Sequence, residues 1–426
     1  MRYEKIGSQL FKGNRSLFVE KMREKSIAVF NSNDLMPKNA DQNMPFKQNS
    51  DLFYLTGIDQ EESILMMVKR PSEVLIYLFI KETNENIKIW EGEKLSKNMA
   101  SEISGIDNIE WLSKFEKKLA QHTQECTSFY LNSNEHPRAN IVVESRDERF
   151  KKWLKNKYPN HIVKKAADIL YPIRAIKKPQ EISMVKKACE ITKKGVIRVL
   201  GFLKPGVLEY EIEAEILHEF VRSGARGFAY DPIIASGANA CVLHYNTNNQ
   251  VCQNGDIILM DFGAEYANYA SDLTRCFPVN GRFTKRQKKV YNSVLRVLNG
   301  SKKLLRPGLL LSDYEKNVGH LVEKELVDLK LLSIKDLGVG SAHPAYKKYF
   351  MHGTSHHLGL DVHDVSAPNQ VLEKGMILTC EPGIYIPEEG LGIRLENDIL
   401  IGPDYNVDLM GDIIIEAEEI EDAMNI

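Results

Sequence analysis

Short hydrophobic runs recur through the first 170 residues of the chain, and they predict β-strands. The clearest runs are IAVFNS (27–32), SILMMV (63–68) and VLIYLFI (74–80), each a few residues long and rich in large or β-branched apolar side chains. Stretches with a helical pattern lie between such runs, for example around residues 111–120. Strands that alternate with helices in this way predict an α/β domain.

The pattern changes at Tyr171-Pro172-Ile173-Arg174. Beyond this point Pro179 fits the first turn of a long amphipathic helix, because proline needs no hydrogen-bond acceptor there. Its apolar positions follow the helical period, at Ile182, Val185, Cys189, Val196 and Val199. We therefore predict two domains, 1–172 and 173–426, which suits a chain of 426 residues at about 150–200 residues per domain.

The second domain contains a weak internal repeat. LKPG (203–206) and LRPG (305–308) each precede an amphipathic helix. GDIILMD (255–261) and GMILTCE (375–381) are each an apolar run that begins after glycine and ends on a carboxylate six positions later. Two generic strand signals could match by chance, but the paired Pro-Gly helix starts in the same order favour a repeat of two related halves.

Each half of the repeat continues into a further strand that carries a second carboxylate, Asp272 in the first and Glu396 in the second. If the two hairpins face each other, these groups meet Asp261 and Glu381 at one central site. His356 adds an imidazole. Hard divalent cations favour carboxylate oxygens with an occasional imidazole, and two ions a few Å apart need carboxylates that bridge them. The set predicts a two-metal hydrolytic site.

The segment FMHGTSHHLGLDVHD (350–364) carries four of the eleven histidines. We assign His356 to metal, His352 and His363 to substrate and transition-state contacts, and His357 to packing or solvent, because not all four can be ligands. A cluster of surface histidines is the alternative. Asp261 and Asp272 could likewise be turn formers at the surface.

Strand alternation in GIRLEND (392–398) predicts that Arg394, Glu396 and Asp398 share one face. Arg394 would then hold the carboxylates by charge-assisted hydrogen bonds, and Asp398 would support the ligands or lie at the surface. His244 is a further candidate for the cleft, although a single histidine of this kind is more often structural.

Composition argues against several classes of partner. Lys+Arg 56 and Asp+Glu 58 give a net charge of -2, which predicts neither a nucleic-acid nor an anionic-membrane partner. We find no apolar stretch near the ~20 residues of a membrane helix. The polar N-terminus predicts no secretory signal. The six cysteines lack CxxC spacing, so we expect free thiols in a reducing cytoplasm.

Several segments resemble aminopeptidase P (Xaa-Pro aminopeptidase). The first domain contributes PFKQNSDLFYLTG (45–57), with Lys47 where the family usually has Arg. The second contributes HYN (244–246), DFGAEY (261–266), SDLTRCFPVNGRFT (271–284), FMHGTSHHLGLDVHD (350–364), ILTCEPGIYI (377–386), GIRLENDILI (392–401) and EAEEIEDAM (416–424). The resemblance implies a mixed α/β (α+β) fold: a creatinase/prolidase-like α/β domain and then the pita-bread catalytic domain shared with prolidase and methionine aminopeptidase, with its internal pseudo-twofold repeat.

The resemblance also implies two divalent metal ions, usually Mn²⁺, with Zn²⁺, Co²⁺ or Mg²⁺ as alternatives. By this match Asp261 chelates one ion, His356 and Glu381 bind the other, and Asp272 and Glu396 bridge them. His244 would line a pocket for proline. Tyr385 and Arg394 would join a substrate-binding hydrogen-bond network, to which the match to RAIKKP adds Arg174. Asp41 and Trp90 fall at positions that relatives supply from a neighbouring subunit, which implies a homo-oligomer, dimer or tetramer.

The implied activity is removal of the N-terminal residue from peptides with proline in second place. A water or hydroxide shared by the ions would attack, Glu381 would carry its proton to the leaving nitrogen, and His363, with His352, would stabilise the oxyanion. Two alternatives remain. A prolidase would cut only Xaa-Pro dipeptides, and a non-catalytic pita-bread module would bind without cleaving.

Overall fold

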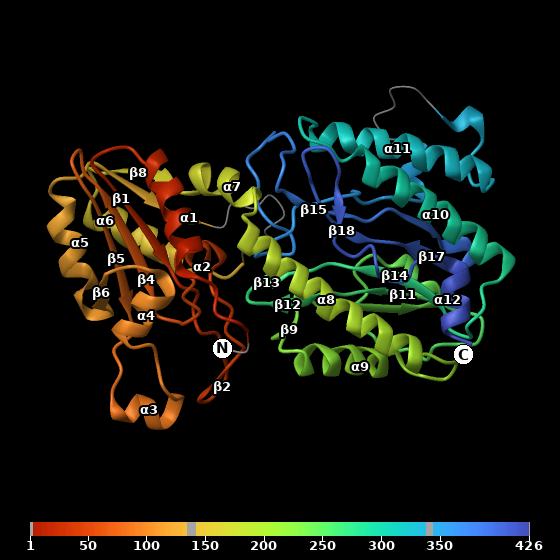
Figure 1. Cartoon of the computed structure of the whole chain (residues 1–426), viewed down its shortest axis with the longest axis horizontal. Coiled ribbons are helices and arrows are strands. Elements are labelled where there is room, and N and C mark those ends of the chain that lie inside the picture. The colour runs from red at the N-terminus through yellow and green to blue at the C-terminus, as the bar shows by residue number, and fades with distance from the viewer. Residues whose placement is uncertain (1–2, 134–141, 338–343, 426) are drawn as a thin grey trace. The chain divides into compact units, whose positions relative to one another are not determined.

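The computed structural model describes residues 3–133, 142–337 and 344–425 of the chain (Figure 1). It divides into two compact units. The smaller is Lys5–Arg174, and the larger is Ala175–Ile426 together with Tyr3 and Glu4. The division falls at the end of helix α7 (Ala167–Ala175) and not in an extended linker.

The smaller unit is a six-stranded sheet with helices on both faces. Its strands lie in the order β6-β5-β4-β1-β7-β8, with β1 antiparallel to β4 and parallel to β7. The strands are β1 (Ser26–Asn31), β4 (Ile64–Lys69), β5 (Val74–Ile80), β6 (Asn108–Trp111), β7 (Ser128–Leu131) and β8 (Ile162–Lys165), beside a separate hairpin of β2 (Pro37–Asn39) and β3 (Gln42–Asn43). The helices are α1 (Ser8–Lys21), α2 (Ser50–Thr56), α3 (Glu85–Glu91), α4 (Lys97–Ser104), α5 (Phe115–Thr123), α6 (Arg146–Lys157) and α7.

Alternation along the central strand β1 explains these two layers. Val29 packs in a core cluster with Phe115 and Leu119 of α5. Its neighbour Phe30 points to the opposite face, where its ring lies 5.4 Å from that of Phe18 of α1. Successive strand residues point to opposite faces, so a strand that is apolar throughout needs cover on both sides.

The larger unit places its strands between two pairs of long helices. Figure 1 shows α8 and α9 along one side of the strands and α10 and α11 along the other. The helices are α8 (Pro179–Phe202), α9 (Glu209–Arg222), α10 (Lys285–Leu304), α11 (Leu311–Asp328) and α12 (Ala417–Ala423). The strands are β9 (Gly227–Phe228), β10 (Ile233–Ser236), β11 (Ile257–Asp261), β12 (Ala264–Tyr266), β13 (Tyr269–Ala270), β14 (Thr274–Pro278), β15 (Ile377–Cys380), β16 (Gly383–Ile386), β17 (Leu391–Arg394), β18 (Asn397–Leu400) and β19 (Val407–Asp408).

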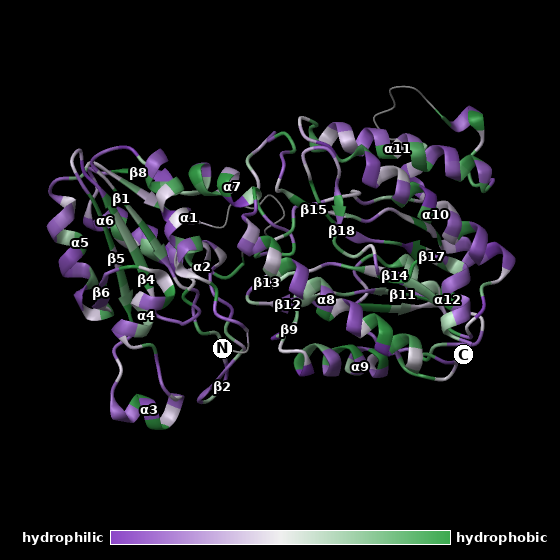
Figure 2. Cartoon of the chain, in the orientation of Figure 1, coloured by the Kyte–Doolittle hydropathy of each residue, from purple (hydrophilic) through white to green (hydrophobic). Residues whose placement is uncertain are grey.

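Apolar side chains concentrate in the strands between these helices. In Figure 2 green predominates along strands such as β4, β5, β11 and β17, whereas helices such as α5 and α10 show much purple. Strands β11 and β15 are buried along almost their whole length. The carboxylates at their ends therefore emerge from an apolar layer. Burying their negative charges there costs free energy unless a partner compensates them.

The two halves of the repeat share backbone contacts at matching positions. Leu208 bridges Val251 in the first half, and Leu310 bridges Val371 in the second. Gly206 N donates to Cys252 O (2.9 Å), as Gly308 N does to Leu372 O (2.8 Å). In each half a helix starts after the Pro-Gly turn, and a buried strand then pairs antiparallel with the strand that returns to it, β11 with β14 and β15 with β18. The internal repeat expected from the sequence is present in the structure.

Several expected elements are found close to their predicted limits. The run 74–80 is strand β5, and Pro179 opens α8. Two expectations were wrong in part. The helix expected around 111–120 begins only at Phe115, because Asn108–Trp111 pair with β5 as strand β6. The segment 392–398 is not one strand, since β17 ends at Arg394 and β18 begins in another sheet at Asn397.

Among the helices of the described residues, none has the length and apolarity that crossing a bilayer requires.

A close backbone approach fixes the hairpin between the two aspartates of the first half. Phe262 N donates to Leu273 O (3.0 Å), which draws the chain after β11 against the chain before β14. A Cβ atom on Gly263 would lie 1.7 Å from Ser271 O. Only glycine therefore lets Asp261 and Asp272 approach each other in this register.

We expect Gly263→Ala to lower the free energy of unfolding by about 3 kcal/mol or more, because backbone would have to move. The matched control is Gly201→Ala near the end of α8, where a new Cβ meets no atom within 4 Å. That change should be neutral or stabilise by up to about 1 kcal/mol through helix propensity. Thermal and urea unfolding would measure both, and equal stability of the two variants would contradict the close approach.

Candidate active site

Four carboxylates reach the site from equivalent places in the two halves. Asp261 is the last residue of β11, and Asp272 lies two residues before β14. Glu381 directly follows β15, and Glu396 lies in the break between β17 and β18. At the end of a strand the backbone is free to turn, so a side chain there can leave the apolar layer and face a shared cavity.

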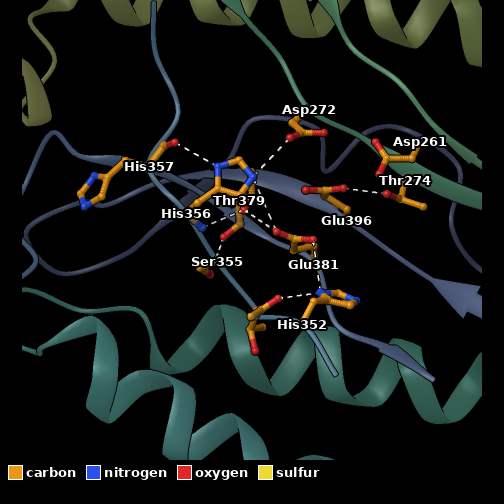
Figure 3. Close-up of polar contacts among 12 residues, drawn as sticks. Asp261, Asp272, Thr274, His352, Ser355, His356, His357, Thr379, Glu381 and Glu396 are labelled. Atoms are coloured by element: carbon orange, nitrogen blue, oxygen red, sulfur yellow. Dashed lines mark hydrogen bonds and ion pairs between the residues drawn. The ribbon is translucent and has the colours of Figure 1, made fainter. Parts of the chain in front are cut away.

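Asp272, His356 and Glu396 form the centre of the cluster (Figure 3). Each offers a ligand atom within 4.8 Å of those of the other two. His356 Nε2 lies 3.5 Å from Asp272 Oδ2 and 3.6 Å from Glu381 Oε1. Asp261 is linked to this centre by Tyr230. The Tyr230 hydroxyl lies 2.6 Å from Asp261 Oδ1 and also contacts Asp272 Oδ1.

A backbone carbonyl fixes the orientation of His356. Its Nδ1 donates to His357 O (3.0 Å), which leaves Nε2 to face the acids. The Nδ1 atom must be the protonated one, because a carbonyl can only accept. This is the tautomer that a metal ligand bonding through Nε2 requires. The His357 ring itself turns away from the cluster and is buried.

Burial makes this set of acids unfavourable without a cation. Burial, and next the charge of Asp261, raise the pKa of Asp272 well above its usual range. Burial, then Asp272 and Glu381, do the same to the pKa of Glu396. Burial raises the pKa of Glu381 to about 7, against the favourable charge of His356. Glu396 Oε1 is buried and has no hydrogen-bond partner among the described residues. These donors fit hard divalent cations, which would neutralise the acids and take up the unused oxygen.

A buried chain of hydrogen bonds supports the acids from one side. Arg394 Nη2 donates to Asp261 Oδ2 (2.6 Å), and Arg394 Nε donates to Thr274 Oγ1 (3.1 Å). Thr274 Oγ1 donates in turn to Glu396 Oε2 (2.6 Å). Arg394 Nη1 donates to the Tyr385 hydroxyl (2.8 Å). One guanidinium therefore connects carboxylates of both halves.

Arg394 and Tyr385 lie beneath the site. They are 3% and 0% exposed. The resemblance to aminopeptidase P places both in a substrate-binding hydrogen-bond network. Here Arg394 holds Asp261 and the Tyr385 hydroxyl holds His352, and a role toward substrate stays a prediction.

His352 is held at both ring nitrogens. Nδ1 donates to Gly353 O (2.8 Å), and Nε2 accepts from the Tyr385 hydroxyl (2.7 Å). Burial, and next the charge of Arg394, lower the pKa of His352 to about 3, so the ring is neutral. It lies 3.6 Å from Glu381 Oε2. A neutral ring with both nitrogens engaged cannot donate to an oxyanion unless one of these bonds breaks.

The remaining predicted residues surround this core. The His363 ring lies edge-on to His356 with centroids 4.3 Å apart. His244 is exposed, in the turn after the 3-10 helix Gly237–Cys241, and close enough for its charge to lower the pKa of His352. Asp41 and Trp90 are exposed in the smaller unit, and Arg174 pairs there with Asp51 (2.6 Å).

Two supporting groups, Tyr230 and Thr274, were not singled out from the sequence. Tyr230 lies in an irregular segment between β9 and β10, where no periodicity marks it. Thr274 could have been suspected, because it stands two residues after Asp272 and opens the strand that follows it. Asp398 was expected to support the ligands or to lie at the surface. It is fully buried, and its Oδ2 accepts from Asp272 N (3.1 Å).

Residues 183–403 match the family model described as metallopeptidase family M24. The chain belongs to metallopeptidase family M24. Residues 11–131 match the model of the aminopeptidase P N-terminal domain. The chain is 36% identical to the Xaa-Pro aminopeptidase of Escherichia coli, over 98% of each chain, and 32% identical to that of Haemophilus influenzae, over 99% of this chain and 98% of the other.

Solved structures extend the similarity to the fold of this M24 peptidase. Zn-substituted E. coli aminopeptidase P in complex with product superposes with a TM-score of 0.88 at 34% identity, over 99% of both chains. The E. coli enzyme with the inhibitor Pro-Leu gives a TM-score of 0.86 at 34% identity, again over 99% of both chains. The α/β N-terminal domain followed by a pita-bread domain, expected from the sequence, is confirmed.

The raised pKa values predict how pH affects the metal-free protein. A carboxyl with a raised pKa binds its proton more tightly in the folded state, so stability is highest at low pH and falls as the group ionises. For Glu381 this loss spans the interval from its usual 4.5 up to about 7. We expect the melting temperature of chelator-treated protein to fall across this range, and Mn²⁺ to reverse the fall at neutral pH.

Glu381→Gln provides the control, because it removes one ionising group and keeps the shape of the side chain. The pH dependence of the metal-free variant should be shallower than that of the wild type. Parallel pH profiles for the two proteins would mean that the pKa of Glu381 is not raised in the folded protein.

Proposed function

We propose that this chain is a metal-dependent Xaa-Pro aminopeptidase that releases the N-terminal residue from peptides with proline in second place. The observation that carries the proposal is the cluster of four carboxylates and His356, drawn from both halves of the fold. It occurs in a chain that is similar over its whole length to Xaa-Pro aminopeptidases. All five proposed ligand positions hold competent side chains, which argues against a non-catalytic binding module.

Asp261, Asp272, His356, Glu381 and Glu396 would hold two divalent cations, of which Mn²⁺ is our first candidate. When bound, the cations would supply an activated water and a polarised scissile carbonyl. The buried carboxylates with raised pKa values and the unpartnered Glu396 Oε1 support this assignment.

Glu381 is the proposed proton carrier. Its side chain is 18% exposed, against 7% for Asp272, so it is the more accessible to a substrate. It would take a proton from the attacking water and give it to the proline nitrogen, which must be protonated to leave. His352 lies 3.6 Å from Glu381 and is neutral, and its low pKa means that it would not take this proton itself.

Specificity for proline would come from shape. The X–Pro amide has no N–H, so a site that pairs with an extended backbone recognises it poorly. His244 would instead line a pocket for the proline ring. His363, beside His356, would donate to the developing oxyanion. Substitution of each histidine would test these two roles.

Oligomeric state and location stay predictions. We propose that the enzyme is a homo-oligomer, in which Asp41 and Trp90 of one subunit approach the site of another. We also propose that it is cytoplasmic. The exposure of Trp90, at 84%, supports the first of these proposals, because so large an apolar side chain gains by being covered.

A short peptide panel tests the activity. After chelation and return of Mn²⁺, we expect hydrolysis of Xaa-Pro-Xaa tripeptides and longer peptides, loss of activity with the chelator, and no cleavage when alanine replaces proline. Cleavage limited to Xaa-Pro dipeptides would favour a prolidase instead. Metal binding without cleavage of any of these peptides would favour a binding module.

We expect Glu381→Gln to lower kcat by about 10²–10⁴-fold, the range for loss of a positioned general acid–base group. Metal content, measured by elemental analysis, separates loss of the proton carrier from loss of a ligand. A variant with full activity and bound metal would refute the role given to Glu381.

A further inference from the structure

We propose that Glu315 is a positioning residue of this site: from helix α11 it sets the conformation of the loop that carries His352 and His356. The inference rests on the proposed function, because the proposed function places His352 and His356 in one metal and substrate site. Glu315 lies outside every sequence segment from which the site was predicted.

Glu315 binds the loop at the two residues between the histidines. Thr354 N donates to both carboxylate oxygens, at 2.8 Å to Oε1 and 3.0 Å to Oε2. Ser355 N donates to Oε1 (3.2 Å), and Thr354 Oγ1 donates to Oε2 (3.1 Å). Four hydrogen bonds from one short segment to one carboxylate fix both its position and its direction.

The held segment is connected to three site residues. His352 lies two positions before Thr354, and His356 lies two positions after it. The carbonyl of Thr354 accepts from Glu381 N (2.8 Å), so the same residue also locates the proposed proton carrier. A shift of this segment would therefore move a ligand, the proton carrier and the histidine beside it together.

The opposite half of the repeat uses the corresponding position differently. Glu315 lies five residues after Leu310, and Glu213 lies five residues after Leu208, the two leucines of the matching backbone bridges. Glu213 accepts from Asn248 Nδ2 (2.8 Å), and Asn248 in turn accepts from Ile234 N of β10 (3.0 Å). Glu213 thus braces a strand through an intermediate side chain, whereas Glu315 directly contacts the loop that carries ligands.

This difference supplies a matched control. Both glutamates are partly buried and occupy the same place in the repeat. A purely structural role for Glu315 predicts that Glu315→Gln and Glu213→Gln behave alike. Positioning of the site predicts that only Glu315→Gln changes the chemistry. In this variant the amide nitrogen, itself a donor, would face donors of the loop.

The experiment uses the full-length protein. For metal-free wild type, Glu315→Gln, Glu315→Asp and Glu213→Gln, Mn²⁺ affinity is measured by calorimetry and the melting temperature by calorimetric scanning. For the Mn²⁺-loaded proteins, kcat and KM are measured on an Xaa-Pro-Xaa peptide. Glu323→Gln, on the same helix but paired with His320 (3.2 Å), serves as a neutral control.

We expect Glu315→Gln to weaken Mn²⁺ binding about 10-fold to 100-fold, the range for loss of a group that supports metal ligands, and to lower kcat more than it raises KM. Glu315→Asp should recover part of both, since it keeps the charge. Glu213→Gln should lower only the melting temperature. If Glu315→Gln binds Mn²⁺ and turns over like the wild type, or changes only as Glu213→Gln does, the positioning role is wrong.

Wild-type protein separates this inference from the proposed function. If the wild type binds Mn²⁺ and cleaves the peptide, the variants decide the role of Glu315 alone. If the wild type neither binds nor cleaves, the proposed function itself fails, and with it the inference. Should Glu315→Gln not fold, Glu315→Asp carries the same comparison.

Discussion

The structure depends on gathering four carboxylates in one buried place. Like charges at close range in a low-dielectric interior repel, and the raised pKa values of Asp272 and Glu396 express that cost. Arg394 offsets part of it by reaching Asp261 directly and Glu396 through Thr274. The rest calls for cations, which would turn the repulsion into ligation. In this M24 peptidase the fold thus accepts a local electrostatic cost at the candidate metal site.

The internal repeat explains how so unfavourable a cluster can be built. Each half supplies a buried strand whose end releases a carboxylate, and the same backbone bridges place both strands. The stability of the apolar strands, not of the acids, fixes the positions of Asp261 and Glu381. Each half, which packs against its own pair of helices, therefore carries only part of the free-energy cost of burying the charges. Gly263 shows how strict the geometry is, because even a methyl group there would meet the backbone.

The sequence predicted those features that short-range patterns encode. Apolar runs gave strands such as β5 to the residue, and the two Pro-Gly turns gave the helix starts of both halves. The five ligand candidates were recognisable because chemistry and motif coincide. Tyr230 and Glu315 were not, since their partners lie 31 to 42 positions away and no periodicity relates them. Trp111 was assigned to a helix because its pairing with β5 is a tertiary fact.

The two halves share a backbone framework but contribute different groups to the site. The ligands that the first half would give are carboxylates only, each held close to a strand whose ladder of hydrogen bonds fixes its backbone. The second half also gives His352 and His356 from a loop, where few such bonds exist to hold Thr354 and Ser355. A loop's orphan N–H groups need acceptors, and a carboxylate satisfies several at once. Glu315 fills that need from the neighbouring helix. Asymmetry of function in a symmetric fold therefore follows from where each half departs from its strands.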